Sequence, residues 1–258
     1  QLQRIYGTSW FSKEDLDQYL IQQDEAEKRD HRKLGNELDL FTSSEELGSG
    51  NFLWKPKGAV LRDVIETYSK KAHLQNGYSL VNTPHIGKSI LWETSGHLDH
   101  YSENMYPPIN HDENNETYYL KPMNCPFHIL VYKSDLHSYK ELPLRYFEFG
   151  SVYRYEKTGV LHGLLRLRGF TQDDAHIFCT TDQINDEVKT LLSFSVNLLG
   201  SYGLTEIEAD LSTKPTKYIG SDKDWDNATN SLKQSLTELD VPFQTAEGEG
   251  AFYGPKID

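Results

Sequence analysis

The stretch of sequence that decides the fold is FGSVYRYEKTGVLHGLLRLRGFTQDDAHIF, residues 149–178. It continues a segment, residues 146–156, in which aromatic and polar side chains alternate as in a half-buried β-strand. After a glycine-containing connection the alternation resumes over residues 166–178, which predicts a second strand of a hairpin. One face of that strand is expected to carry six side chains: Arg166, Arg168, Phe170, Gln172, Asp174 and His176. The hairpin should therefore pack on one face and present charge on the other.

The hairpin is also a local basic cluster in an acidic chain. The 258 residues include 26 Lys and Arg against 39 Asp and Glu, and this net charge of −13 argues against broad adhesion to nucleic acid or anionic membrane. Within residues 150–172, Arg154, Lys157, Arg166, Arg168 and His162 face a single acid, Glu156. Arginines held on a strand can bind a phosphate bidentately, and an aromatic ring beside them can stack on a base. Walker-type and dinucleotide-type glycine motifs are absent, so the pattern predicts either a nucleotide site of another kind or a surface hairpin with scattered arginines.

Outward from the hairpin, helical and strand patterns follow one another. Helices are expected after Ser12, over residues 59–74, after Thr180 and over residues 225–239, and strands over residues 78–83 and 206–211. The strand at 206–211 alternates cleanly with one wet face, which favours a mainly antiparallel sheet and an α+β fold. The charged stretch 24–33 reads as a solvated helix face, and the Pro/Asn-rich stretch 96–118 as an irregular insertion.

Composition indicates the class of protein and its compartment. Hydrophobic residues make up 37% and aromatic residues 12%, which excludes a disordered chain and a coiled coil. No window approaches 18 uninterrupted apolar residues and the first residues lack signal-peptide character, so neither membrane insertion nor export is expected. Two cysteines cannot form a disulfide framework, which favours a reducing compartment, the cytoplasm.

Those cysteines lie near histidines at zinc-like spacing. Cys125 precedes His128 by three positions, and His176 precedes Cys179 by three. Positions three apart on a strand point to opposite faces, so His176 and Cys179 are not expected to converge, and Cys179 reads as a core residue. Cys125 and His176 remain a candidate ligand pair without a third member, and structural roles for both stay open.

The quoted stretch resembles motif 2 of the class II aminoacyl-tRNA synthetases, in which a strand ending in Arg-x-Glu leads through a loop to a strand with an adenine-stacking Phe. GYSLVNTP (77–84) resembles motif 1 of the same class. Further segments are similar to the threonyl-tRNA synthetase family and extend the likeness over essentially the whole chain: RIYGTSW (4–10), KRDHRKLG (28–35), LWETSGHLDHY (91–101), LKPMNCPFH (120–128) and GEGAFYGPKID (248–258).

The resemblance implies an antiparallel sheet of six to seven strands flanked by helices, and a homodimer formed through motif 1. Residues 1–50 would be an N-terminal linker and helix, and residues 51–258 the catalytic core with motifs 1 and 2. Motif 3 with a second catalytic arginine, a third zinc ligand and the anticodon-binding domain would lie beyond Asp258. This chain alone is therefore not expected to have full activity.

The implied reaction joins threonine to ATP, giving threonyl-adenylate and pyrophosphate, and then transfers the threonyl group to the 3′ end of threonine tRNA. For ATP, Arg154 would hold the α-phosphate, Glu156 the adenine edge, Phe170 the adenine face, and Arg166 and His162 the outer phosphates beside magnesium. Lys256 would also face phosphate, and His97 would assist the transfer to tRNA. The threonine pocket would comprise Met123, Gln172, Asp174 and Tyr253.

Zinc bound by Cys125, His176 and the outside ligand would read the amino and hydroxyl groups of threonine, with His128 and Cys179 not among its ligands. Two rival functions are a catalytically silent synthetase-like module that binds nucleotide or tRNA, and a zinc hydrolase. The hydrolase would have only Asp174 as its general base and would leave the phosphate-binding face unexplained.

Overall fold

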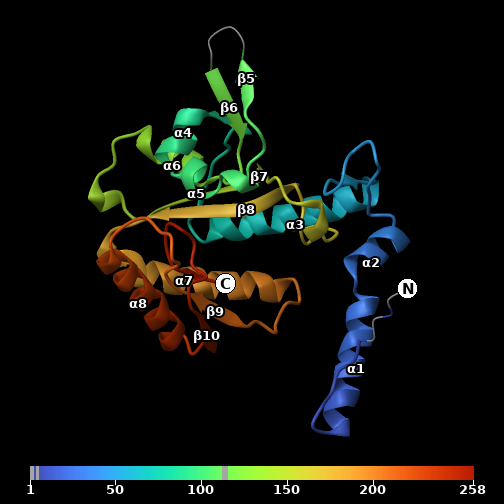
Figure 1. Ribbon diagram of the computed structural model, residues 1–258. Helices are drawn as coiled ribbons and strands as arrows, with labels where there is room; N and C mark the ends of the chain where they lie inside the picture. The colour runs from blue at the N-terminus through green and yellow to red at the C-terminus, as the bar shows by residue number, and fades with distance from the viewer. Residues whose placement is uncertain (1–2, 4–5, 112–115) are drawn as a thin grey trace. The chain divides into compact units, whose positions relative to one another are not determined.

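The computed structural model describes residues 3, 6–111 and 116–258 (Figure 1). Arg4 and Ile5 of the segment 4–10, and residues 112–115 of the insertion expected over 96–118, lie outside the described residues. The chain forms two compact units. The first comprises Gln1–Ile65 and Arg154–Gly169, and the second Glu66–Tyr153 and Phe170–Asp258. The connection between the two expected hairpin strands thus clusters with the N-terminal part of the chain.

The first unit is mostly helical. Its elements are α1 (Lys13–Lys28), α2 (His31–Glu37), β1 (Phe41–Thr42), β2 (Leu53–Trp54), the beginning of α3 (Pro56–Gln75) and the 3₁₀ turn η3 (Thr158–Val160). The expected start of α1 is confirmed, because the Ser12 hydroxyl accepts a hydrogen bond from the backbone N–H of Asp15 at 3.0 Å. β1 and β2 pair antiparallel, and Phe41 packs edge-on against Trp54. The charged stretch is a solvated face, as expected, with exposed ion pairs from Lys28 to Asp24 and Glu25.

The second unit combines small sheets with helices. Its strands are β3 (Ser79–Leu80), β4 (Ile86–Lys88), β5 (Ile109–His111), β6 (Glu116–Leu120), β7 (Leu144–Tyr153), β8 (Gly169–Phe178), β9 (Ala209–Ser212), β10 (Phe243–Ala246) and β11 (Lys256–Ile257). Besides the rest of α3, its helices are α4 (Ser89–Thr94), α5 (His97–His100), η1 (Ser102–Asn104), α6 (Cys125–Lys133), η2 (Tyr139–Glu141), η4 (Thr181–Gln183), α7 (Ile184–Ser201) and α8 (Asp222–Glu238).

The strands of this unit form three sheets of three strands, in the orders β3-β7-β8, β4-β6-β5 and β10-β9-β11. The pairs β4–β6, β5–β6 and β9–β11 are antiparallel, whereas β3–β7 and β9–β10 are parallel. The α+β class is confirmed. In the described part of the chain the strands are distributed over small sheets, and no single sheet has six or seven strands.

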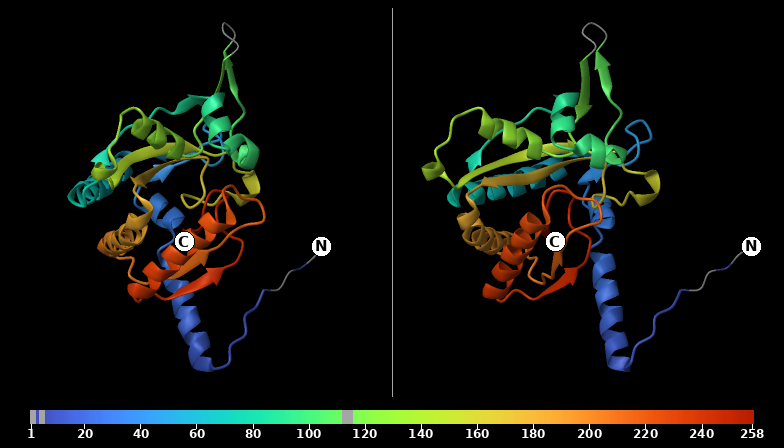
Figure 2. Two further views of the ribbon diagram at one scale, coloured as in Figure 1. Left: turned by 90° about the vertical axis from the view of Figure 1, so that its left-hand side faces the viewer. Right: turned by 60° about the vertical axis from the view of Figure 1, so that its left-hand side comes forward.

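Three apolar clusters form the core of the second unit. Tyr78, Phe147 and Phe194 join the segment before β3 to β7 and α7, and α3 adds the ring of His73, which stacks on Phe147 with centroids 4.0 Å apart. A second cluster, Trp92, Met105 and Phe127, lies under α4 and α6. A third, Ala209, Leu211 and Leu236, lies where α8 packs on the β9–β10 pair, near the red C-terminal part of the chain in Figure 2. The helix predicted over 225–239 is α8, and the capping box predicted between Thr180 and Gln183 is formed.

Helix α3 is longer than the predicted 59–74, and its apolar side is largely exposed. Val60, Leu61, Val64 and Ile65 are 65%, 45%, 60% and 43% exposed. Tyr68 is 46% exposed although its hydroxyl donates to the Ser201 hydroxyl. No helix among the described residues has the length and apolar character needed to cross a membrane.

Candidate active site

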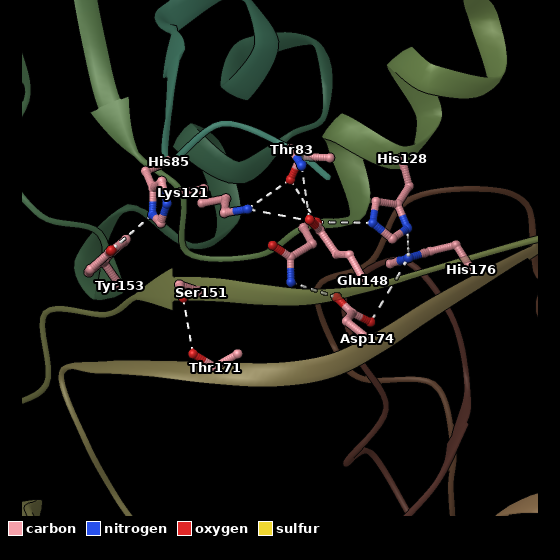
Figure 3. Close-up of polar contacts among 11 residues, drawn as sticks. Thr83, His85, Lys121, His128, Glu148, Ser151, Tyr153, Thr171, Asp174 and His176 are labelled. Carbon is pink, nitrogen blue, oxygen red and sulfur yellow. Dashed lines mark hydrogen bonds and ion pairs between the residues drawn. The ribbon is translucent and has the colours of Figure 1, made fainter. Parts of the chain in front are cut away.

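Strand β8 provides the polar face from which the site is built. Gln172, Asp174 and His176 recur at period two and are partly buried, whereas Asp173 is exposed and accepts a hydrogen bond from the Ser69 hydroxyl of α3 at 2.8 Å. Asp174 and His176 contact Asn124 and His128, whereas Ala175 and Ile177 pack against the cluster around Phe147, so the predicted alternation is confirmed over residues 174–177. The neighbouring strand β7 contributes Glu148, and the segment before and within α6 contributes Lys121, Asn124 and His128 (Figure 3).

Glu148 is the centre of this network and is only 2% exposed. It accepts hydrogen bonds from the backbone N–H and hydroxyl of Thr83, at 2.9 and 2.6 Å, and from Nε2 of His128 at 3.1 Å. Lys121, 1% exposed, lies 3.7 Å from the same carboxylate and donates to the Thr83 hydroxyl at 2.8 Å. The alternation of the sequence predicts Glu148 on a charge-presenting face. That prediction is wrong, because both faces of β7 are buried at this point.

The protonation of Glu148 follows from these contacts. Burial raises its pKa, but the hydrogen bonds from His128 and Thr83 and the charge of Lys121 outweigh burial and lower the pKa to about 2. Burial lowers the pKa of Lys121, and the charge of Glu148 partly offsets that effect. The buried carboxylate is therefore ionised at neutral pH and acts only as a hydrogen-bond acceptor.

The carboxylate of Glu148 orients the two histidines of the site, His128 directly and His176 through His128. Because Glu148 accepts from Nε2 of His128, the Nδ1 of a neutral His128 carries a lone pair. Nδ1 of His176 lies 2.9 Å from that Nδ1 and is placed to donate to it. Burial lowers the pKa of His176, with the charge of Asp174 acting in the opposite direction. The arrangement leaves Nε2 of a neutral His176 as the nitrogen with a lone pair.

Asn124 holds the other polar side chain of β8. Its amide nitrogen donates to Oδ2 of Asp174 at 3.0 Å, and the residue is completely buried. Its Oδ1 is buried without a hydrogen-bond partner within the described part of the chain. Gly150 on β7 permits this arrangement, because a Cβ at that position would lie 2.2 Å from the Asn124 amide. A buried acceptor without a partner is rare in folded proteins and marks this contact as a point of strain or of binding to water or ligand.

The cysteines occupy different surroundings. Cys125 is the first residue of α6, one turn before His128, rather than part of a free turn. Cys179 follows the end of β8 and is half-buried, and burial raises the pKa of its thiol. No group of three His, Cys, Asp or Glu side chains suited to hold a metal occurs among the described residues.

The basic cluster differs from the prediction. β7 ends at Tyr153 and β8 begins at Gly169, so Arg154, Glu156 and Arg166 lie in a connecting loop rather than on strands. In the loop, Arg166 forms an ion pair with Glu156 at 3.1 Å. The side chain of Arg168 donates to the backbone oxygens of Glu156 and Ser49, so it braces the loop and does not belong to a functional row. Figure 3 shows Ser151 and Thr171 near this end of the strands, with their hydroxyls 3.0 Å apart.

The remaining predicted residues are placed as follows. Arg154, Glu156, His162 and Arg166 belong to the first unit, and Phe170, at the start of β8, to the second. His97 is 4% exposed, its two ring nitrogens contact the Ser95 hydroxyl and the sulfur of Met123, and burial lowers its pKa. The neighbouring His100 is exposed and stacks on Phe252. Tyr253 is 56% exposed, and Lys256 on β11 pairs with Asp258.

Sequence reasoning missed the buried supports of the site: Thr83, Lys121, Asn124, His128 and Glu148. The available signal was weak. Three polar residues interrupt the otherwise apolar and proline-rich run 120–131, and Glu148 lies inside an aromatic strand. A polar residue inside such a run is either exposed or paired in the core, and the sequence does not identify its partner.

Comparisons with known proteins agree on one family. A family model described as "tRNA synthetase class II core domain (G, H, P, S and T)" matches residues 106–258. The chain is 55% identical over 257 residues to the threonine–tRNA ligase of Sulfurihydrogenibium sp. and 54% identical over 258 residues to that of Aquifex aeolicus. Each alignment covers 100% of this chain and 40% of the relative, so the chain spans about 40% of the length of these relatives.

Solved structures give the same family. A crystal structure titled as the RNA binding domain of threonyl-tRNA synthetase from Cryptosporidium parvum Iowa II has a TM-score of 0.80 and 40% identity, covering 89% of this chain and 56% of that one. A threonyl-tRNA synthetase described as putative, ThrRS-1 from Aeropyrum pernix, has a TM-score of 0.75 and 34% identity, covering 83% of this chain and 49% of that one. A prolyl-tRNA synthetase from Giardia lamblia, 15% identical with a TM-score of 0.58 over 66% of this chain and 35% of its own, shares the fold.

Proposed function

The chain belongs to the class II tRNA synthetase core family, and on that premise we propose that it carries the amino-acid-activating part of a threonine–tRNA ligase. The proposed reaction forms threonyl-adenylate and pyrophosphate from threonine and ATP and then transfers the threonyl group to threonine tRNA. One geometric observation supports this proposal more than any other. Asp174 and His176, two residues apart on β8, are each held by a buried residue of the segment 124–128.

The polar face of β8 supports selection of threonine. The Asp174 carboxylate, fixed by Asn124, is proposed to accept from the ammonium or hydroxyl group of the substrate, with Gln172, Met123 and Tyr253 around it. Valine fits almost the same volume but would leave such a carboxylate without its partner. A purely apolar pocket separates near-isosteres by only ~10²-fold, whereas a pocket that requires the hydroxyl discriminates far more strongly.

We propose that a zinc ion binds here, held in part by two donors from this part of the chain. His176 would bind through Nε2, since Nδ1 is directed to His128, and Cys125 would supply a thiolate from the first turn of α6. A third ligand would come from outside this chain. When bound, zinc supplies a Lewis-acidic position for the amino and hydroxyl groups of threonine. Cys125→Ser or His176→Ala in a longer protein should lose zinc, whereas Cys179→Ser should keep it, and metal content measures the difference.

The loop 154–168 supports binding of ATP with magnesium. Arg154 and Arg166 are proposed for the phosphates, with His162 and Lys256 in supporting positions, Glu156 for the adenine edge and Phe170 for its face. Arg166 is already neutralised by Glu156 within the loop, so ATP would exchange that partner for phosphate oxygens. The transition state spreads charge over the α-phosphate, so fixed cations should contribute more than proton transfer. His97, buried against Met123, is the proposed helper in transfer to tRNA.

Two further properties belong to this proposal. The exposed apolar side of α3, together with the motif 1 segment 77–84, is proposed as a homodimer interface. The cytoplasm is the proposed compartment, because two cysteines in 258 residues cannot form a disulfide framework.

Threonine-dependent exchange of pyrophosphate into ATP tests the function in a protein extended past Asp258. Exchange should be specific for threonine over valine. Arg154→Ala should reduce it by about 10²- to 10³-fold, the usual loss when a fixed transition-state donor is removed, with an unchanged melting temperature. Lys157→Ala, an exposed change in the same loop, is the matched control. ATP binding without exchange for any amino acid would support the silent binding module instead.

A further inference from the structure

The loop 154–168 is held by the N-terminal part of the chain, and one contact is made by a motif to which no role has yet been given. The motif is KRDHRKLG, residues 28–35, and its histidine, His31, begins α2. Nε2 of His31 accepts a hydrogen bond from the backbone N–H of Leu164 at 2.8 Å. The two residues are 133 positions apart in the chain, so this is a tertiary contact within the first unit.

The backbone amide of Leu164 lies in a turn and needs a hydrogen-bond acceptor from outside that turn. Residues 162–165 form a tight turn in which the N–H of Leu165 donates to the carbonyl of His162 at 2.9 Å. His162 and Arg166 close the turn as an antiparallel bridge, with two backbone hydrogen bonds of 3.3 Å. In such a turn the third residue's N–H points outward and has no partner within the turn. His31 supplies that partner.

Gly163 shows how closely the imidazole approaches the turn. Its φ is +48°, a conformation that favours glycine, and a Cβ there would lie 2.1 Å from Nε2 of His31. The fit therefore depends on the glycine for two independent reasons. The sequence HGLL, residues 162–165, meets both requirements at once.

Arg168 fixes the other end of the same loop. Its backbone N–H donates to the carbonyl of Gly50 at 2.9 Å, and its guanidinium donates to the carbonyls of Ser49 and Glu156 at 3.2 and 3.0 Å. Arg166 lies between this brace and the turn held by His31, and it pairs with Glu156. The direction of its side chain thus depends on two anchors from outside the loop.

We infer that His31 is a positioning residue for ATP: by accepting from Leu164 it fixes the turn 162–165 and so presents Arg166 and His162 to the phosphates. This inference rests on the proposed function and adds a role for the N-terminal segment. His31 itself makes no contact with the nucleotide. Its effect should appear in ATP affinity and in the order of the turn, and hardly in global stability.

The test combines Mg²⁺-ATP binding by calorimetry with hydrogen exchange at the Leu164 amide, on this chain. His31→Leu removes the acceptor at similar size and should weaken ATP binding and speed that exchange by about five- to tenfold, the scale of one lost hydrogen bond. His31→Gln retains an acceptor and should restore most of both. Gly163→Ala should reproduce the His31→Leu effect. Lys33→Ala, exposed on the same helix, is the matched control and should change neither quantity.

The outcomes separate the inference from the function beneath it. If the unmodified chain does not bind ATP, the inference fails, whereas pyrophosphate exchange in the protein extended past Asp258 decides the proposed function separately. If it binds ATP and His31→Leu leaves the affinity within about twofold, only the inference is overturned. The inference also fails if His31→Gln rescues neither quantity, or if His31→Leu lowers the melting temperature as much as a core substitution such as Leu236→Ala.

Discussion

At the scale of single residues, the site depends on charges that are buried and mutually satisfied. Glu148 and Lys121 are each almost inaccessible to water, and burying either alone would cost several kcal/mol. Thr83 contacts both of them and so completes the hydrogen bonding of the pair. The arrangement gives the carboxylate one fixed role as an acceptor, which in turn orients His128 and His176.

Glu148 should make the stability of the protein depend on acid pH. Its pKa in the folded state is about 2, below the ordinary 4.5, so its contribution is fully present above pH 4.5 and is lost as the pH falls towards 2. A shift of this size corresponds to about 3 kcal/mol of unfolding free energy. Glu148→Gln should cost about 3–5 kcal/mol at pH 7, because Lys121 loses its buried partner. Urea unfolding of both proteins between pH 7 and pH 3 measures the two effects.

The prediction for Glu148 has a matched control and one outcome that would contradict it. Glu93→Gln, an exposed carboxylate on α4, should leave both the stability at pH 7 and its acid dependence almost unchanged. If Glu148→Gln loses stability with falling pH as steeply as the unmodified protein, the acid dependence comes from other groups and the assignment to Glu148 is wrong.

At the scale of elements, β7 and α6 pack closely at one point, Gly150 against Asn124. A methyl group at Gly150 would overlap the Asn124 amide, so Gly150→Ala should push α6 away from the strand and weaken the hydrogen bond to Asp174. Overpacking of this kind costs about 1–3 kcal/mol. Thermal unfolding should show the loss, and threonine binding should weaken more than ATP binding.

Gly159→Ala is the matched control for that change. Gly159 lies in η3, and nothing within 4 Å would meet a Cβ there. It should therefore be tolerated. Equal effects of the two substitutions would show that the close contact between β7 and α6 does not govern the site.

The elements also show what the sequence can and cannot predict. The starts of α1 and η4 were predictable because a capping residue is a local signal. The periodic apolar face predicted α8, although that helix begins at Asp222, three residues before the predicted start. The face of β8 that bears Gln172, Asp174 and His176 was predictable for the same reason. The ends of β7 and β8 were not, because alternation continues into residues 154–156 and 166–168. After the hydrogen bond from the Arg154 N–H to the Arg168 carbonyl, the backbone there bonds within the loop or to Gly50. Contacts such as Arg168 to Gly50 or His31 to Leu164 join distant parts of the chain, and the periodicity of the sequence does not predict them.

The residues of the site also fall into two groups, those that the sequence predicts and those that it does not. The residues that would meet ligand, such as Asp174 and His176, could be proposed from spacing and from a family resemblance. Their supports could not, because a buried Lys121 or Asn124 reads in the sequence like any surface residue. The pairing that makes such burial tolerable becomes visible only when three separate segments, at Thr83, Glu148 and residues 121–128, come together.

At the scale of the whole molecule, the exposed apolar side of α3 indicates a surface that binds a partner. Leu61, Val64, Ile65 and Tyr68 recur at helical spacing and remain 43–60% exposed. A helix of 20 residues is about 30 Å long, and such a face can form the core of an interface of the usual size, about 1,200–2,000 Å². Soluble monomers rarely leave a continuous apolar face of this extent open. A second copy of the chain is the occupant proposed above.

Val64→Asp tests that partner, because this side chain is 60% exposed and its replacement removes little packing within one chain. A charge at the centre of the interface should shift the protein from dimer to monomer, weakening association by at least about tenfold, since an unpaired buried charge costs several kcal/mol. Sedimentation velocity over a range of concentrations measures the shift. Lys70→Glu, an exposed charge reversal on the same helix, should leave the dimer intact. A protein that is monomeric before any substitution, or a dimer that survives Val64→Asp unchanged, would remove α3 from the interface and leave its exposed side without this explanation.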